Sequence, residues 1–136
     1  MRYLGMDLGT KTLGLATSDK LGIIASPYKL LRFNQVAEVI NEVLKIIETE
    51  KIEAIVLGLP KNMNNSLGQA AERSLVFKAL LETKTQVPVN LVDERLSTVE
   101  AENILIKEGV SRKKRKNIID GLSASIILDT YLRKVG

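Results

Sequence analysis

The chain contains no cysteine, no histidine and no tryptophan, and aromatic residues make up only 4% of its 136 residues. The absence of cysteine excludes disulfides and thiolate metal sites, and the absence of histidine removes the commonest general base and the commonest zinc ligand. Any catalysis must therefore use carboxylates, hydroxyls, amines or a metal ion held by oxygen ligands. The scarcity of aromatic side chains also argues against binding by extensive base stacking.

Long hydrophobic runs are also missing. No stretch approaches the roughly 20 apolar residues of a membrane span, and the first residues carry a charge inside their apolar run and lack the small-residue cleavage site of a signal peptide. We therefore expect a cytoplasmic protein with no membrane contact. A chain of this length with 45% hydrophobic residues predicts one domain over residues 1–136.

Positive charge is concentrated in one unbroken run over residues 112–116. The formal net charge is +4, and it would be −1 without this run. The run consists of Arg112, Lys113, Lys114, Arg115 and Lys116. Such a cluster indicates contact with a polyanion, although a solvated helix start or loop has the same composition.

A single carboxylate interrupts the first apolar segment, residues 3–10. Strand alternation places Tyr3, Gly5 and Asp7 on one face. Aspartate is depleted in strands and costly to bury unless it is paired, hydrogen-bonded or bound to a metal. We interpret Asp7 as the first ligand of a metal-dependent phosphodiester site. The alternative is a structural aspartate that caps the following turn.

The remaining pattern predicts an α/β fold. Residues 13–18 and 23–26 are expected to continue the first strand as an antiparallel meander. Asn34 can cap a helix whose apolar residues follow the 3.6-residue period to residue 47. The continuous apolar run 54–59 predicts a central parallel strand covered on both faces.

In the second half, residues 61–66 form a polar loop, and Ser66 and Gln69 have the spacing of a capping box for a helix to about residue 81. A fifth strand over residues 89–92 is followed by a short helix that ends at Gly109. The last helix carries Asp120 on a stripe of core-type residues, Ala124, Ile127 and Tyr131, whereas Asp129 falls on the opposite, solvated side.

These elements bring three carboxylates to places suited to a metal ion. They are Asp7, one of Asp93 and Glu94, and Asp120; Asp93 and Glu94 point to opposite faces, so at most one of them can face Asp7. Oxygen ligands without histidine or cysteine select Mg²⁺ or Mn²⁺. Two such ions can support phosphodiester hydrolysis, and Arg95 lies beside the cluster, able to orient a carboxylate or contact a phosphate.

Four sequence blocks resemble the YqgF/RuvX family, whose members are small RNase H-like proteins described as Holliday junction resolvases and as pre-16S rRNA nucleases. The blocks are residues 7–16 (DLGTKTLGLA), 58–64 (GLPKNMN), 93–98 (DERLST), and Asp120 with the serines that follow it at positions 123 and 125. The resemblance covers essentially the whole chain. It implies an RNase H-like fold with a five-stranded mixed sheet in the order 3-2-1-4-5, flanked by helices.

By the same resemblance, Asp7, Glu94 and Asp120 are the catalytic, metal-binding carboxylates, with Mg²⁺ or Mn²⁺ as the cofactor. The choice of Glu94 over Asp93 comes from the resemblance. The basic residues expected at the substrate are Lys11, Arg95, Arg112, Lys113, Lys114, Arg115 and Lys116.

The expected function is hydrolysis of phosphodiesters in structured nucleic acid. One substrate is the 5′ end of pre-16S rRNA during ribosome biogenesis, with ribosomal precursor particles as partners. The alternative is branched DNA at a Holliday junction, and a non-catalytic nucleic-acid-binding or ribosome-assembly factor is a further alternative. We expect a monomer or a weak homodimer. The Asp-x-Gly-Thr turn also resembles the phosphate loop of the actin, Hsp70 and sugar-kinase group, but that group uses two such domains.

Overall fold

A computed structural model describes residues 1–60, 68–93 and 106–135, with the backbone alone over residues 115–121. Its sheet has the order β3-β2-β1-β4-β5, which confirms the expected order and mixed topology. The strands are β1 (Tyr3–Leu8), β2 (Thr12–Ser18), β3 (Ala25–Arg32), β4 (Ala54–Leu59) and β5 (Val89–Asp93), and the helices are α1 (Val36–Thr49), α2 (Gln69–Glu82) and α4 (Arg112–Val135). β1 pairs antiparallel with β2 and parallel with β4.

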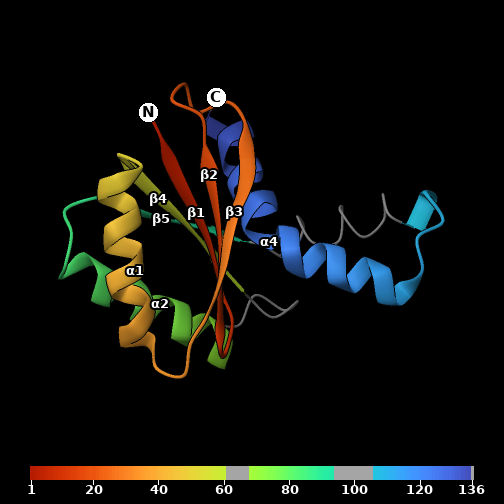
Figure 1. Cartoon of the computed structure of the whole chain (residues 1–136), viewed down its shortest axis with the longest axis horizontal. Helices are drawn as coiled ribbons and strands as arrows, with labels where there is room; N and C mark the ends of the chain where they lie inside the picture. The colour runs from red at the N-terminus through yellow and green to blue at the C-terminus, as the bar shows by residue number, and fades with distance from the viewer. Residues whose placement is uncertain (61–67, 94–105, 136) are drawn as a thin grey trace.

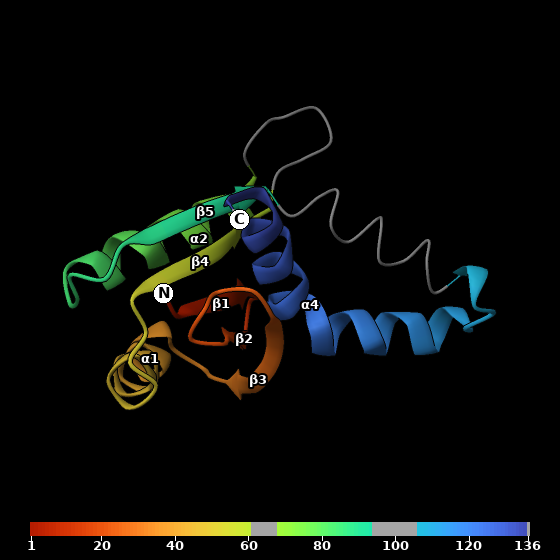
Figure 2. The ribbon, with the colours of Figure 1, turned by 90° about the horizontal axis from the view of Figure 1, so that it is seen from above.

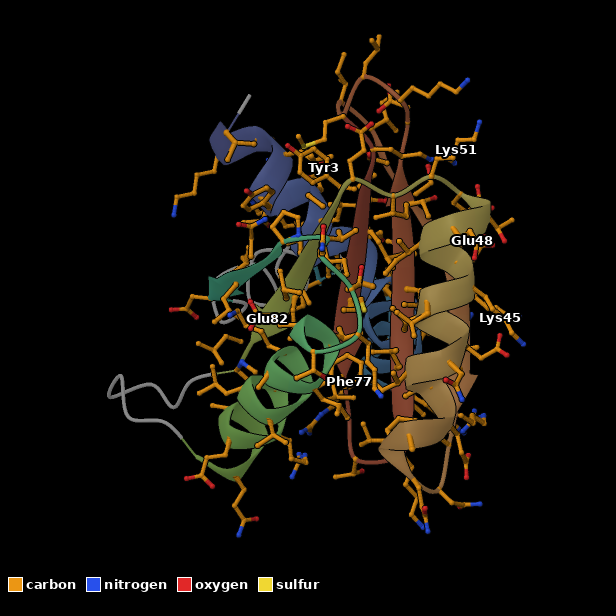
Figure 3. All side chains as sticks on the ribbon, turned by 90° about the vertical axis from the view of Figure 1, so that its left-hand side faces the viewer. Tyr3, Lys45, Glu48, Lys51, Phe77 and Glu82 are labelled. Atoms are coloured by element: carbon orange, nitrogen blue, oxygen red, sulfur yellow. The ribbon has the colours of Figure 1, made fainter. Side chains whose placement is uncertain are left out.

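The sheet separates two apolar layers. Helices α1 and α2 cover one face and α4 covers the other (Figures 1 and 2). Figure 3 looks onto the α1 and α2 side, where Phe77 points from α2 into the core while Lys45 and Glu48 lie on the outer surface of α1. All six residues of β4 are buried, as expected for a central strand between two helical layers.

The third strand differs from the prediction. It was expected over residues 23–26, but β3 begins at Ala25 and extends to Arg32. The reason lies in the preceding turn, where the backbone N–H groups of Ile23 and Ile24 donate to the Asp19 carboxylate at 2.7 and 2.9 Å. These bonds hold both residues outside the strand, and they lower the pKa of Asp19.

The predicted helix starts also differ. Asn34 does not cap α1: Gln35 occupies the cap position, and the backbone N–H of Asn34 instead donates to the Glu38 carboxylate at 3.3 Å. Gly68 occupies the cap position of α2, so the capping box at Ser66 is wrong. The polar loop 61–66 and most of the helix predicted before Gly109 lie outside the described residues.

The last helix, α4, begins with the basic run, so residues 112–116 form its first turns. Ser111 caps the helix through its hydroxyl oxygen, which accepts from the Lys114 N–H at 3.4 Å. The helix bends in its middle, and its first half projects away from the sheet (Figures 1 and 2). Gly121 and the hydroxyl bond from Ser125 to the Leu122 carbonyl, both near the middle, are recognised causes of bending.

The second half of α4 packs on the sheet. Ala124 and Ile127 are buried there as predicted, together with Leu128 and Leu132. Asp129 pairs with Arg133 at the surface, as its predicted position indicated. Neither α4 nor any other helix in the described part of the chain is long and apolar enough to cross a membrane.

The approach of α4 to the sheet depends on Gly5 in β1. A Cβ atom added at Gly5 would lie 2.7 Å from the Cβ of Leu128 and 2.9 Å from the carbonyl oxygen of Ala124. Neither atom is the end of a flexible side chain, so the helix itself would have to move. Only glycine allows this contact.

We therefore expect Gly5→Ala to lower the free energy of unfolding by about 1–3 kcal/mol, the usual cost of overpacking a core. Urea denaturation followed by circular dichroism measures it. Gly14→Ala is the matched control, because an added Cβ there meets its nearest neighbour at 3.7 Å, an ordinary contact. Equal stability of the two variants would show that α4 does not pack on β1 in this way.

Candidate active site beside Asp7

Asp7 lies on the face of the sheet that α4 covers, next to a hollow of roughly 380 Å³. The carboxylate is half-buried near the carboxyl end of β1. The hollow is lined by residues of three strands, the first turn and α4: Asp7, Gly9, Thr12, Gly14, Leu30, Arg32 and Ser123. Because Ser123 belongs to α4, this helix passes over the strand that carries Asp7.

Two glycines shape the hollow in different ways. Gly9 closes the turn after β1 by donating its N–H to the Thr12 carbonyl at 2.8 Å, and a Cβ there would lie 2.9 Å from the Thr12 hydroxyl. Gly14 pairs with Asp7 across β1 and β2, and a Cβ there would lie 3.8 Å from the Asp7 Cβ and 3.7 Å from the Ala124 Cβ. Gly14 therefore leaves open the space where β1, β2 and α4 meet.

The parallel strands β1, β4 and β5 end at the same edge of the sheet. Met6 pairs with Leu57, and Leu57 pairs with Leu91, so Asp7 and Val92 each lie one residue further along. Neighbouring strands are about 4.8 Å apart, which places β5 about 10 Å from β1. Gly58 lies between them on β4, where it is buried, and it has no side chain that could stand between Asp7 and Val92.

The alternation of β5 separates the two candidate carboxylates. Val92 packs in the layer of α4, on the face of Asp7, whereas Leu91 packs in the layer of α1 and α2. Asp93 therefore falls on the face opposite Asp7 and cannot share its hollow. Glu94, the predicted ligand, lies outside the described residues, as does Arg95.

Asp120 belongs to α4, one turn before Ser123, and its side chain is outside the described part of the structure. A residue one turn from Ser123 lies on nearly the same side of the helix. Ser123 thus brings α4 to the hollow of Asp7, and Asp120 precedes it by three residues on the same helix. Among the described residues no three carboxylates come together. The hollow supplies one carboxylate, Asp7, with the hydroxyls of Thr12 and Ser123, and oxygen donors are those that a hard divalent cation prefers.

The predicted basic residues lie in two places. Lys11 is exposed in the turn between β1 and β2, and among the described residues it is not one that lines the hollow. Arg112, Lys113 and Lys114 are exposed on the projecting half of α4. Arg115 and Lys116 follow on the same helix, with side chains outside the described part.

Sequence reasoning missed Arg32, Leu30 and Ser123 as residues of the hollow. Arg32 and Leu30 were missed because the third strand was predicted to end at residue 26, six residues before its observed end at Arg32. The alternation of the true strand would have placed both beside Asp7. Ser123 was noted only as a small residue, although its distance of one turn from Asp120 was a signal for the site.

Comparison with known proteins gives matches over nearly the whole chain. A sequence model of the RuvX family, described as Holliday junction resolvase, matches residues 1–134. A protein of Lacticaseibacillus casei (strain BL23), provisionally named a pre-16S rRNA nuclease, is 45% identical over 100% of this chain and 96% of its own length. A protein of Geobacillus sp. (strain WCH70) with the same provisional name is 47% identical over 97% of each chain.

Among solved structures, T. thermophilus RuvC in complex with a Holliday junction substrate has a TM-score of 0.61 and 17% identity. The match covers 98% of this chain and 94% of that one. At this identity the likeness concerns the fold, and it confirms the RNase H-like architecture expected from the sequence.

The packing of α4 beside Asp7 can be tested with cysteines, since the chain has none. A Cβ at Gly14 would lie 3.7 Å from that of Ala124, within the range of disulfides. We expect a Gly14→Cys/Ala124→Cys variant to form an intramolecular disulfide on mild oxidation, detected by loss of titratable thiols.

The control pairs Gly14→Cys with Val135→Cys, an exposed position at the far end of the same helix. This pair should keep its thiols. Free thiols in the Gly14 and Ala124 variant as well would mean that α4 does not cross the sheet beside Asp7.

Proposed function

The chain belongs to the RuvX family, and on that basis we propose that it is a divalent-metal-dependent nuclease that hydrolyses phosphodiesters of structured nucleic acid, with precursor 16S rRNA as substrate. The observation that carries the proposal is the half-buried carboxylate of Asp7 in a hollow at the carboxyl edge of the sheet, beneath the helix that carries Asp120. Relatives at 45–47% identity are provisionally named pre-16S rRNA nucleases.

We assign the metal ligands to Asp7, Glu94 and Asp120. Asp93 falls on the face opposite Asp7, and the choice of Glu94 follows the family resemblance. These three ligands would hold Mg²⁺ or Mn²⁺, which would supply Lewis acidity and activate the attacking water, a task that falls to histidine in many other hydrolases. The carboxylates would hold the charge that attracts the cations, and Gly14 leaves room beside Asp7.

The basic run on α4 supports a polyanionic substrate. Cations at a helix N-terminus oppose the helix dipole, at a typical cost of about 0.3–1 kcal/mol each. The first turn of α4 holds no acidic residue to offset them. Local helix stability therefore does not account for the run, whereas bound phosphates would neutralise the cations. Its projection beyond the sheet leaves the exposed side chains open to a large partner (Figure 2).

A second candidate substrate is the four-way DNA junction. The description of the matching family as Holliday junction resolvase favours it. The metal site acts on a phosphodiester in either substrate, so the distinction lies outside the hollow. Resolution of a junction needs two cuts and therefore two copies of the chain, whereas trimming of an RNA end needs one.

We expect Asp7→Asn to reduce Mn²⁺-dependent cleavage at least about 100-fold, because a neutral amide binds a divalent cation far more weakly than a carboxylate does. Cleavage is measured side by side on a pre-16S rRNA fragment and a synthetic four-way junction. Preferential cutting of the RNA supports the first substrate. A wild-type protein that binds RNA but never cuts either probe with Mn²⁺ would show a binding factor and not an enzyme.

Three further variants are measured in the same assay, one as a control and two as a matched pair. Asp129→Asn removes a carboxylate from α4 at a surface ion pair and should leave cleavage within about twofold of the wild type. Glu94→Gln should reduce cleavage as Asp7→Asn does, while Asp93→Asn should not. The reverse order for the last two variants would overturn the assignment of Glu94.

We also expect replacement of Lys113, Lys114 and Arg115 by serine to weaken nucleic-acid binding and to reduce the slope of log affinity against log salt by about 2–3, or 0.7–0.9 per lost phosphate contact. The control removes three cations far from the site, with Lys45→Ser, Lys51→Asn and Lys84→Ser. Lys45 and Lys51 lie on the side of α1, away from α4 (Figure 3). An unchanged slope in the α4 variant would exclude the run from the interface.

A further inference from the structure

Arg32 ends the edge strand β3 and faces the hollow of Asp7. It pairs with Thr12 across β2 and β3, and two residues earlier Leu30 pairs with Gly14. Directly paired residues share a face of the sheet. Arg32, Thr12 and Gly14 therefore share the face of Asp7, and all four residues line the hollow.

The side chain of Arg32 is available to a ligand. It is exposed, and in the described ranges it makes no hydrogen bond or ion pair. Other arginines of the chain are held by partners: Arg2 pairs with Glu50 at 3.2 Å and donates to the Ser18 carbonyl at 3.1 Å, and Arg133 pairs with Asp129. The stability of the fold thus accounts for Arg2 and Arg133 but not for Arg32.

We propose that the guanidinium of Arg32 binds phosphate oxygens of the substrate strand at the hollow, next to the phosphodiester that is cut. The inference rests on the proposed function and adds to it a substrate-binding residue on the edge strand. A guanidinium presents two parallel N–H donors that match two phosphate oxygens, and it stays charged at every working pH. As an edge strand, β3 leaves open the side from which a strand of nucleic acid can reach the hollow.

This role differs from that of the basic run. At 1.5 Å per residue, the run lies about 10–17 Å along the helix axis from Ser123, which lines the hollow. That length corresponds to roughly three to five base-pair steps of 3.4 Å. The run therefore contacts phosphates several nucleotides from the cut, while Arg32 contacts phosphate at the cut. Arg32 fixes the position of the scissile group and the run holds the flanking duplex.

Lys29 provides the matched control for Arg32. It is an exposed cation on the same strand, but it pairs with Leu15, which belongs to the core of the α1 and α2 layer. Lys29 thus carries the same charge on the opposite face. A general effect of net charge would change both variants alike, whereas a phosphate contact at the hollow would change only Arg32.

The experiment measures binding of the RNA fragment and of the four-way junction in EDTA, where a metal-dependent enzyme binds without cutting. We expect Arg32→Gln to weaken binding about 10–100-fold and to reduce the salt slope by about 0.7–0.9, the value for one phosphate contact. Arg32→Lys should restore the slope but only part of the affinity, because an ammonium lacks the paired donors. Lys29→Gln should stay within about twofold of the wild type.

Cleavage with Mn²⁺ gives a second readout, in which Arg32→Gln should raise KM and also lower kcat, because the phosphate is misplaced relative to the metal ligands. Equal effects of Arg32→Gln and Lys29→Gln would overturn the proposal. So would a loss of Mn²⁺ affinity or of thermal stability with unchanged nucleic-acid binding, since Arg32 would then act on the Asp7 carboxylate alone.

The two proposals fail separately. A wild-type protein that binds the probes without cutting them would overturn the nuclease function, and the binding comparison would still decide the role of Arg32. Normal cleavage with unchanged binding in Arg32→Gln would overturn only the role of Arg32. Binding of neither probe by the wild type would overturn both.

Discussion

The close contact between α4 and β1 is the constraint on which the rest of the structure depends. With glycine at position 5, the backbone of α4 at Ala124 and the Cβ of Leu128 come within 2.9 Å of where a side chain would begin. This contact sets the height of α4 above the sheet. Because Ser123 and Asp120 lie on the same helix, it also sets how far the helix stands from Asp7. The same contact therefore determines both the packing of the core and the distance of α4 from Asp7.

The elements that the sequence predicted best are those whose signals are local and whose burial is complete. The apolar run 54–59 matches β4 residue for residue, and the periodic helix near residues 36–47 matches α1. The failures arose where a side chain acts on the backbone over a few residues. The carboxylate of Asp19 holds two apolar residues out of β3, and α1 follows Gln35, whose side chain makes no cap bond.

The candidate site was predicted in part for a related reason. Strand alternation placed Asp7 on a definite face, and it stated that Asp93 and Glu94 must diverge. Neither fact reveals which face of β5 meets α4, because that depends on pairing between strands far apart in the sequence. Once Val92 is placed in the layer of α4, the same alternation assigns Asp93 to the other face. The bend of α4 could not be predicted, since Gly121 weakens a helix without giving the direction of the turn.

Two glycines lie near Asp7, at positions 5 and 14, and packing requires only one of them. Glycine at position 5 is required for packing, but glycine at position 14 is not, since a Cβ there would meet only ordinary contacts at 3.7 Å or more. An alanine at position 14 would also lower the entropy of the unfolded chain and so favour folding. Stability alone would therefore not select glycine next to Asp7. The proposed site gives a reason, because its ions and the substrate phosphate would have to fit between Asp7, Arg32 and the overlying helix, where an added methyl group would take up their space.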